Sequence, residues 1–111
     1  MHGDTLDDKA KRARLEESKE VRTLIYEWGL TLLEIDRKYK LPRGTAGTTL
    51  REPNLAGEKA IAKAVGVKAF QLWPSRYHSN GRRKSPQPSE NYDRLTSQDR
   101  SRLAQAQKGA A

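Results

Sequence analysis

Five basic residues and no acidic one lie between Arg37 and Arg51. Lysine and arginine side chains gathered in this way bind phosphate groups, which a nucleic acid duplex presents along its backbone. Thr45 and Thr48 lie within the same segment, and the threonine hydroxyl and methyl suit base edges and phosphate oxygens. Any one of these cations read alone is equally compatible with an ordinary solvated charge. The cluster without acidic neighbours therefore predicts a binding surface for nucleic acid.

Other kinds of site find little support in the 111 residues. The chain has no cysteine, which excludes a disulfide framework and a thiolate metal site. His2 and His78 both lie in polar end segments, so we expect no metal and no cofactor. The acidic residues Glu34, Asp36 and Glu58 are spread over two predicted helices, where capping or surface roles are available to each. Without a nucleophile–base pair or a glycine-rich phosphate loop, we expect that the protein is not an enzyme.

The formal charge of +8 is unevenly distributed along the chain. Residues 1–16 have no net charge, whereas residues 17–77 and 78–111 each have a net charge of +4. Nearly all large apolar side chains fall within 17–77, which we expect to be the folded domain behind a charged N-terminal extension, 1–16. Residues 78–111 are predicted to form a flexible basic tail, because 78–92 are rich in Ser, Pro, Gly and Asn and should be disordered. A short helix over 93–108 is compatible with the sequence, although its apolar face is small.

Every segment of the middle block has helical periodicity, and none alternates like a strand. Gly29 should end the first helix, and Thr31 with Glu34 forms the capping box of the second. The charged run before Glu17 can extend the first helix into solvent. The predicted helices span about 17–28, 31–39, 43–51, 54–66 and 68–72. The predicted core comprises Val21, Leu24, Ile25, Trp28, Leu32, Ile35, Tyr39, Ala46, Leu50, Leu55, Ile61, Ala64, Val65, Phe70, Leu72 and Trp73.

The second and third helices are separated by only a few residues, which is typical of a helix-turn-helix. Apolar residues occupy the positions that hold the two helices of this motif at a fixed angle. Three positions depart from the usual pattern, because Asp36 replaces a small residue, Lys40 replaces the turn glycine, and Thr49 replaces a larger apolar group. We therefore predict an all-α protein, with a compact helix-turn-helix domain of four to five helices and flexible tails.

The sequence Leu72-Trp73-Pro74-Ser75-Arg76-Tyr77 follows the predicted helix 54–66, which contains the pattern GE-x-x-I-A-x-A from Gly57 to Ala64. Over about residues 21–77 this pattern resembles the Ner family, small helix-turn-helix regulators of transposing phages with Ner-like bacterial relatives. The resemblance implies a lambda-repressor-like helical domain, sequence-specific duplex binding and control of transcription, with 43–51 as the recognition helix. Similar domains occur at the start of bacterial activators of prophage-derived gene clusters, including gene transfer agents, so the sign of regulation stays open.

The predicted interface has two parts, one that faces the bases and one that holds phosphates. Gly44 and Gly47 each cost about 1 kcal/mol inside a helix relative to alanine, which suggests close approach of a duplex or of a neighbouring helix. Thr31 is expected to act as a cap first, and Arg76 can equally pin the end of the domain. The predicted major-groove surface is Arg43, Gly44, Thr45, Gly47, Thr48 and Arg51. The predicted phosphate contacts are Thr31, Arg37, Lys40 and Arg76.

The expected partner is double-stranded DNA, and a second copy on adjacent DNA would lengthen the short site that one domain reads. One alternative is a protein-interaction module that recruits RNA polymerase or a second regulatory protein, for example through residues 93–108, with DNA binding weak or shared. Another is nonspecific architectural binding, which predicts steep salt dependence without a preferred site. Without an apolar run of membrane-spanning length or a secretory signal, we expect a cytoplasmic, nucleoid-associated protein.

Overall fold

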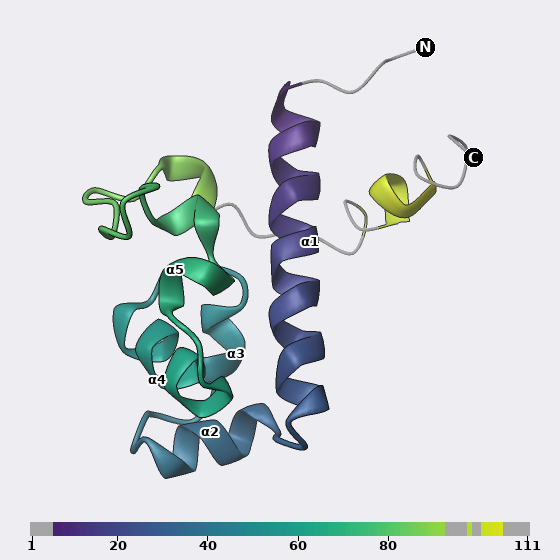
Figure 1. Ribbon diagram of the computed structural model, residues 1–111. Helices are drawn as coiled ribbons and strands as arrows, with labels where there is room; N and C mark the ends of the chain where they lie inside the picture. The colour runs from purple at the N-terminus through teal and green to yellow at the C-terminus, as the bar shows by residue number, and fades with distance from the viewer. Residues whose placement is uncertain (1–5, 93–97, 99–100, 106–111) are drawn as a thin grey trace.

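The computed structural model describes residues 6–92, 98 and 101–105 of the chain. Its described part is all-α, as predicted, with no strand beyond a single bridge between Tyr77 and Arg83. Figure 1 shows one long helix standing beside a globule of short helices. The elements are α1 (Leu6–Glu27), α2 (Leu32–Lys38), α3 (Thr45–Thr49), α4 (Leu55–Val65), α5 (Ala69–Leu72) and the 3-10 helices η1 (Pro74–Arg76) and η2 (Ser89–Tyr92).

Helix α1 is about twice as long as the predicted 17–28, because the charged run before Glu17 is also helical (Figure 1). A short helical segment, 101–105, lies beside the N-terminal half of α1, where Arg102 Nη1 is 2.8 Å from Asp8 Oδ2. Leu103 of this segment is buried. The remainder of the helix predicted over 93–108, apart from residue 98, lies outside the described residues.

The predicted caps are confirmed. The Glu34 backbone N–H donates to Thr31 Oγ1 at 3.1 Å, and the Thr31 N–H donates to Glu34 Oε1 at 2.8 Å. At the start of α4, the Asn54 side chain accepts a hydrogen bond from the Gly57 N–H at 2.9 Å. Gly29 ends α1 with a φ of 71°, a value that favours glycine. Local sequence therefore determines where most of these helices start and stop.

The core forms where α1, α2, α3 and α4 meet, and its largest fully buried side chain is Trp73. Three predicted core residues are instead exposed: Trp28 by 57%, Leu55 by 45% and Phe70 by 40%. Each of them lies at the end of an element, where periodicity gives a direction but no neighbouring element to cover it. Phe70 contacts the turn at Gly81, but that turn still leaves it 40% exposed. The buried core comprises Val21, Ile25, Ile35, Ala46, Leu50, Ala60, Ile61, Val65 and Trp73.

The prediction of a disordered segment over 78–92 is wrong. The His78 N–H donates to the Arg82 carbonyl at 2.7 Å and the Lys84 N–H to the Arg76 carbonyl at 3.0 Å, which makes residues 76–84 a short hairpin. Beyond it, the buried Asn91 side chain donates to the Ser75 carbonyl at 3.1 Å. The composition of 78–92 lacks apolar side chains, but polar contacts to the helical domain hold it in place. These contacts join residues far apart in sequence, which composition does not reveal.

Candidate nucleic-acid interface

A buried carboxylate joins the two helices of the helix-turn-helix. Asp36 in α2 accepts hydrogen bonds from the Gly44 N–H at Oδ2 and from the Ala46 N–H at Oδ1, both at 2.8 Å. The first residues of α3 receive no cap from Gly44 itself. Asp36 supplies that cap from another helix and places negative charge at the positive end of the α3 dipole. Asp36, which replaces the usual small residue, therefore fixes α3 against α2.

Helix α3 is shorter than the predicted 43–51, because its N-cap is Gly44 and its C-cap is Leu50. Gly44 has a φ of 92°, so it lies outside the helix in a conformation that favours glycine. The helix cost that the sequence assigned to Gly44 therefore does not apply. Arg51 continues the chain in a turn, with its N–H donating to the Thr48 carbonyl at 2.9 Å.

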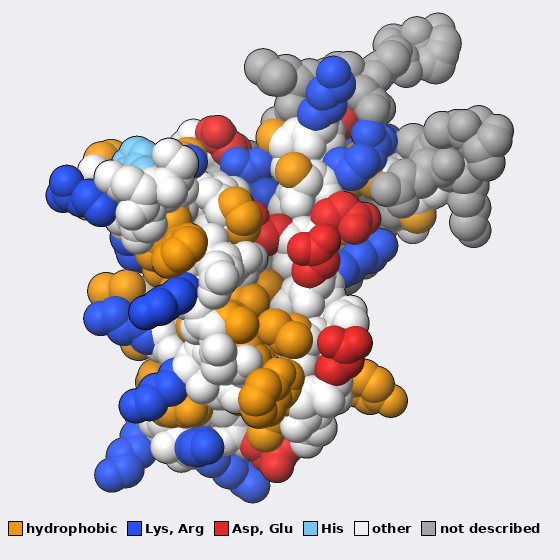
Figure 2. Space-filling view, in the orientation of Figure 1, with side chains coloured by type: hydrophobic (Ala, Val, Ile, Leu, Met, Phe, Trp, Pro, Cys, Tyr) orange, Lys and Arg blue, Asp and Glu red, His pale blue; other side chains and the backbone are white. Residues whose placement is uncertain are grey.

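The structure brings most of the predicted interface residues to one exposed surface around α3 and the preceding turn. Lys40 occupies the turn with a φ of 56°, where the usual motif has glycine. Basic side chains crowd one edge of the molecule in Figure 2, while acidic side chains gather along α1 on the same face. Exposed residues of this surface are Thr31, Arg37, Lys40, Arg43, Gly44 and Arg51, and half-buried ones are Thr45, Gly47 and Thr48.

Four cations of this surface form no ion pair within the described part of the chain: Arg37, Lys40, Arg43 and Arg51. Since unpaired, exposed guanidinium and ammonium groups keep all their donors available, they can bind phosphate oxygens without first breaking a contact. The arrangement therefore supplies what a nucleic acid backbone requires.

A substitution at Gly47 distinguishes the two explanations for glycine in α3, which are close helix packing and close approach of DNA. A methyl group built on Gly47 would lie 3.9 Å from Leu32 Cδ1, an ordinary contact. Gly47→Ala should therefore raise the free energy of unfolding by up to about 1 kcal/mol, through helix propensity. If DNA approaches the backbone here, the same variant should bind its DNA site more weakly. Urea denaturation and DNA titration measure the two effects. A destabilised variant would contradict the space observed beside Leu32.

The close packing of α3 on α4 depends on Gly57, which the sequence did not single out for this role. A methyl group on Gly57 would overlap the Thr49 side chain. Thr49 is fully buried and donates its hydroxyl hydrogen to the Thr45 carbonyl at 2.7 Å, so its position is fixed from within α3. A larger apolar group at position 49 would not fit against α4. The departure from the usual pattern at Thr49 therefore has a packing reason.

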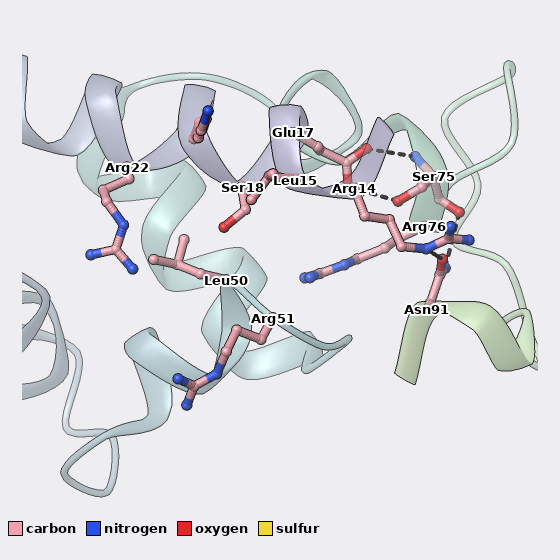
Figure 3. Close-up of a pocket in the computed structure, with 11 residues that line it drawn as sticks. Arg14, Leu15, Glu17, Ser18, Arg22, Leu50, Arg51, Ser75, Arg76 and Asn91 are labelled. Carbon is pink, nitrogen blue, oxygen red and sulfur yellow. Dashed lines mark hydrogen bonds between the residues drawn. The ribbon is translucent and has the colours of Figure 1, made fainter. Parts of the chain in front are cut away.

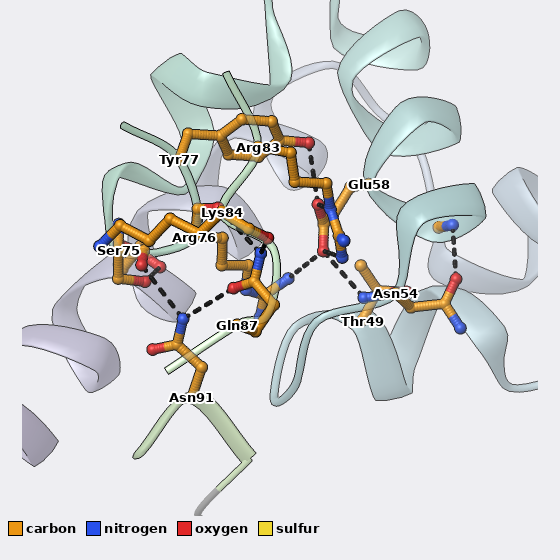
Figure 4. Close-up of polar contacts among 12 residues, drawn as sticks. Thr49, Asn54, Glu58, Ser75, Arg76, Tyr77, Arg83, Lys84, Gln87 and Asn91 are labelled. Atoms are coloured by element: carbon orange, nitrogen blue, oxygen red, sulfur yellow. Dashed lines mark hydrogen bonds and ion pairs between the residues drawn. The ribbon is translucent and has the colours of Figure 1, made fainter. Parts of the chain in front are cut away.

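Glu58 is the centre of a buried polar network (Figure 4). Its Oε2 accepts the Asn54 N–H at 2.8 Å, and its Oε1 accepts the Tyr77 hydroxyl at 2.9 Å. Its Oε1 lies 3.1 Å from Arg83 Nε, and its Oε2 lies 3.3 Å from Arg76 Nη1. One carboxylate thus ties α4 to η1 and to the 76–84 hairpin. The contact with Asn54 is the local capping role that the sequence allowed, whereas the pairing with Arg76 and Arg83 joins Glu58 to residues far along the chain, which periodicity does not reveal.

Arg76 does not belong to the exposed surface. Its guanidinium is buried beside Glu58 and stacks 4.9 Å from the centroid of the Trp73 ring. Burial lowers the pKa of Arg76, and the nearby Glu58 carboxylate opposes that change. The predicted phosphate contact is therefore corrected in favour of the alternative role, in which Arg76 pins the end of the domain.

Tyr77 offers a spectroscopic test of the Glu58 network. Burial, followed by the hydrogen bond to Glu58, raises the pKa of Tyr77 to about 12. The folded protein thus holds this proton more tightly than the unfolded chain, whose tyrosines titrate near pH 10. The contribution to stability should be complete below about pH 10 and lost as the pH rises toward 12. An ultraviolet titration with Tyr77→Phe as reference measures it, and a difference spectrum centred near pH 10 would contradict the contact.

Comparison with known proteins identifies the kind of domain. Residues 17–89 match the family described as winged helix-turn-helix DNA-binding. The chain is 36% identical over 66 residues to sugar fermentation stimulation protein B of Escherichia coli (strain K12), which covers 60% of this chain and 65% of that protein. The protein of the same name from Shigella flexneri matches with the same identity and extent. The match thus spans slightly less than two thirds of these curated relatives. No solved structure matches the chain.

The described residues contain no helix long and apolar enough to cross a membrane. They also contain no group of three or more His, Asp or Glu side chains placed to hold a metal ion.

Proposed function

Because the chain belongs to the winged helix-turn-helix DNA-binding family, we propose that it is a sequence-specific DNA-binding transcriptional regulator. In this proposal α3 lies in the major groove of double-stranded DNA. The observation that carries the proposal is the exposed, unpaired cationic surface around α3, which Asp36 holds in a fixed orientation.

Each part of the surface has a proposed role. Arg43 and Arg51 lie at the two ends of α3 and donate to base edges or phosphates, while Thr45 and Thr48 contact bases between them. Arg37 and Lys40, on α2 and its turn, hold phosphates and set the register of the domain on the duplex. Thr31 caps α2 and is exposed at the same time, so its hydroxyl serves a phosphate only secondarily.

The matched residues 17–89 include the 76–84 hairpin, and we propose that this hairpin is the wing. Arg83 in this hairpin turns inward to Glu58, whereas Arg82 is exposed. We assign Arg82 a nonspecific attraction for the DNA backbone. The finer identity that we propose is a Ner-like regulator with a lambda-repressor-like domain. It would act on DNA in the cytoplasm, without enzymatic activity.

Arg51→Ala should weaken binding to the preferred DNA site by about 1–3 kcal/mol, because it removes a charged donor from the end of the reading helix. Fluorescence anisotropy with the preferred site and a scrambled duplex measures the change at fixed salt. Lys63→Ala is the matched control, because Lys63 is exposed on α4, away from the α3 surface. Equal affinity of Arg51→Ala and the parent protein would refute the role of Arg51.

The proposal as a whole is tested by a bind-and-sequence selection with the full chain and sheared genomic DNA at physiological salt, where nonspecific binding is weak. A short enriched motif is the expected result, and paired half-sites would reveal two copies on the DNA. DNA retained without a motif would replace the proposal with architectural binding. No retained DNA would replace it with a protein-interaction module.

A further inference from the structure

A cavity of about 280 Å³ lies where α1 faces the end of α3 and the η1 and η2 turns. Figure 3 shows Arg22 of α1 and Arg51 extending at one side of it, with Arg14, Ser75 and Asn91 at the other. Leu15 and Leu50 supply apolar wall. We call this space the α1–α3 cavity. It lies next to the proposed DNA surface but is separate from the exposed face of α3.

The lining of the α1–α3 cavity is strongly cationic. Five basic side chains contribute to it, namely Arg14, Lys19, Arg22, Arg51 and Arg76. Arg76 is already paired with Glu58 at 3.3 Å, and Arg14 lies 3.8 Å from Glu90. Lys19, Arg22 and Arg51 therefore face the single lining carboxylate, Glu17. Glu17 is already occupied, since Ser75 donates its hydroxyl to Oε1 at 2.6 Å and its N–H to Oε2 at 3.1 Å. Burial raises the pKa of Glu17, and the two hydrogen bonds from Ser75 oppose that change. An anion entering the cavity therefore meets an excess of positive charge.

The cations lie at two depths. Lys19, Arg22 and Arg51 are exposed at the mouth and form no ion pair within the part of the chain that the structure describes. Deeper inside, the side chain of Arg76 is only 5% exposed, and that of Arg14 is 19% exposed. The Ser18 hydroxyl faces the same space and could hydrogen-bond a ligand. Because Arg76 and Arg14 already have partners, the anionic group of a ligand would bind the cations at the mouth, and its polar substituents would reach the Ser18 hydroxyl.

We propose that the α1–α3 cavity binds a small phosphorylated molecule, with its phosphoryl group held by Arg22 and Arg51. A phosphate of the DNA backbone has the same chemistry, but a duplex lying on α3 would meet the exposed cations at the mouth and leave the buried part of the cavity empty. The volume is near the lower limit of small-molecule sites, which suits a compact phosphate ester. Because Arg51 also belongs to the proposed DNA surface, the ligand and DNA compete for it. This last step rests on the proposed function.

Calorimetric titration of the DNA-free full chain tests the binding step, with pyrophosphate and ribose 5-phosphate as probes. We expect saturable binding of at least one probe. Arg22→Gln should weaken it by about tenfold, the effect of one charge-assisted hydrogen bond. Ser18→Leu should weaken it as much by filling the cavity without changing the charge. Lys63→Gln removes an equal charge at an exposed position of α4 and should change the affinity less than about twofold.

Two results would overturn the proposal. One is the absence of saturable binding by either probe, and the other is an equal loss in Lys63→Gln, which would indicate general charge attraction. If Arg22→Gln weakens DNA binding while no probe binds the free chain, the cavity mouth serves the DNA backbone and the small-molecule site is refuted. If a probe binds but DNA does not bind the chain at all, the cavity site stands and the proposed function fails. The expected competition is a lower DNA affinity in saturating probe at constant ionic strength, with Ser18→Leu insensitive to the probe.

Discussion

Glu58→Ala should lower the free energy of unfolding by about 3–5 kcal/mol, because it leaves a buried guanidinium without its partner. The Glu58 carboxylate is fully buried and faces both Arg76, itself buried, and the half-buried Arg83. Removing it also deprives the Asn54 N–H and the Tyr77 hydroxyl of their acceptor. Since small domains are stable by only about 5–15 kcal/mol, this variant should lie at or beyond the limit of folding.

Urea denaturation at about 15 °C, near the temperature of greatest stability, measures the loss. Glu27→Ala is the matched control, because Glu27 is exposed on α1 and should change the stability by less than about 0.5 kcal/mol. Glu58→Gln keeps an acceptor for Asn54 but removes the charge, and should be intermediate. In Glu58→Ala, hydrogen exchange should accelerate more in the 76–84 hairpin than in α4. A loss below about 1 kcal/mol in Glu58→Ala would show that the network contributes little to stability.

The features that sequence predicted well depend on residues close to each other in the chain. The capping box of Thr31 and Glu34, the Asn54 cap and the stop at Gly29 each arise within one turn of helix. The backbone groups at a helix end need a partner, and a polar side chain a few residues away is the nearest one. Caps can therefore be read from a short stretch of sequence without knowledge of the fold.

Several features that sequence missed depend on pairs of residues far apart in the chain. Arg76 and Arg83 lie many residues after Glu58 in the sequence, so sequence alone did not reveal that they pair with it. As charged residues they were equally compatible with an exposed surface or a tail. Composition predicted disorder for 78–92 because it counts apolar side chains and ignores a buried carboxylate elsewhere. Trp28 was predicted to be core by helical period, which gives a face but cannot show that α1 ends there uncovered.

Sequence predicted which residues around α3 are exposed, but it did not predict the contacts that hold α3 in place. The segment containing Arg43, Thr45, Thr48 and Arg51 is exposed or half-exposed around α3, as the cluster of cations suggested. The orientation of that surface, however, depends on Asp36, which the sequence pattern marked only as a departure from the usual motif. A carboxylate at this position is unfavourable between packed helices unless backbone donors meet it, and the N–H groups at the start of α3 are such donors.

Asp36→Ala should lower the free energy of unfolding by about 3 kcal/mol, because two charge-assisted hydrogen bonds to the start of α3 are lost. It should also weaken DNA binding at least about tenfold, although Asp36 is buried and an acidic side chain would only repel phosphates. The reason is that α3 has five residues and no cap of its own, so without Asp36 it loses its fixed orientation.

Asp36→Asn is the informative companion, because its amide keeps one acceptor oxygen and should retain about half of the stability that Asp36→Ala loses. DNA titration is carried out where circular dichroism shows each variant to be folded, so that lost affinity reports the orientation of α3 and not global unfolding. The control Lys59→Ala removes an exposed charge on α4 and should preserve both properties. If Asp36→Ala is destabilised yet binds DNA with parental affinity, the carboxylate supports the fold alone, and the DNA-reading surface is positioned by the packing of Ala46 and Leu50 in the core.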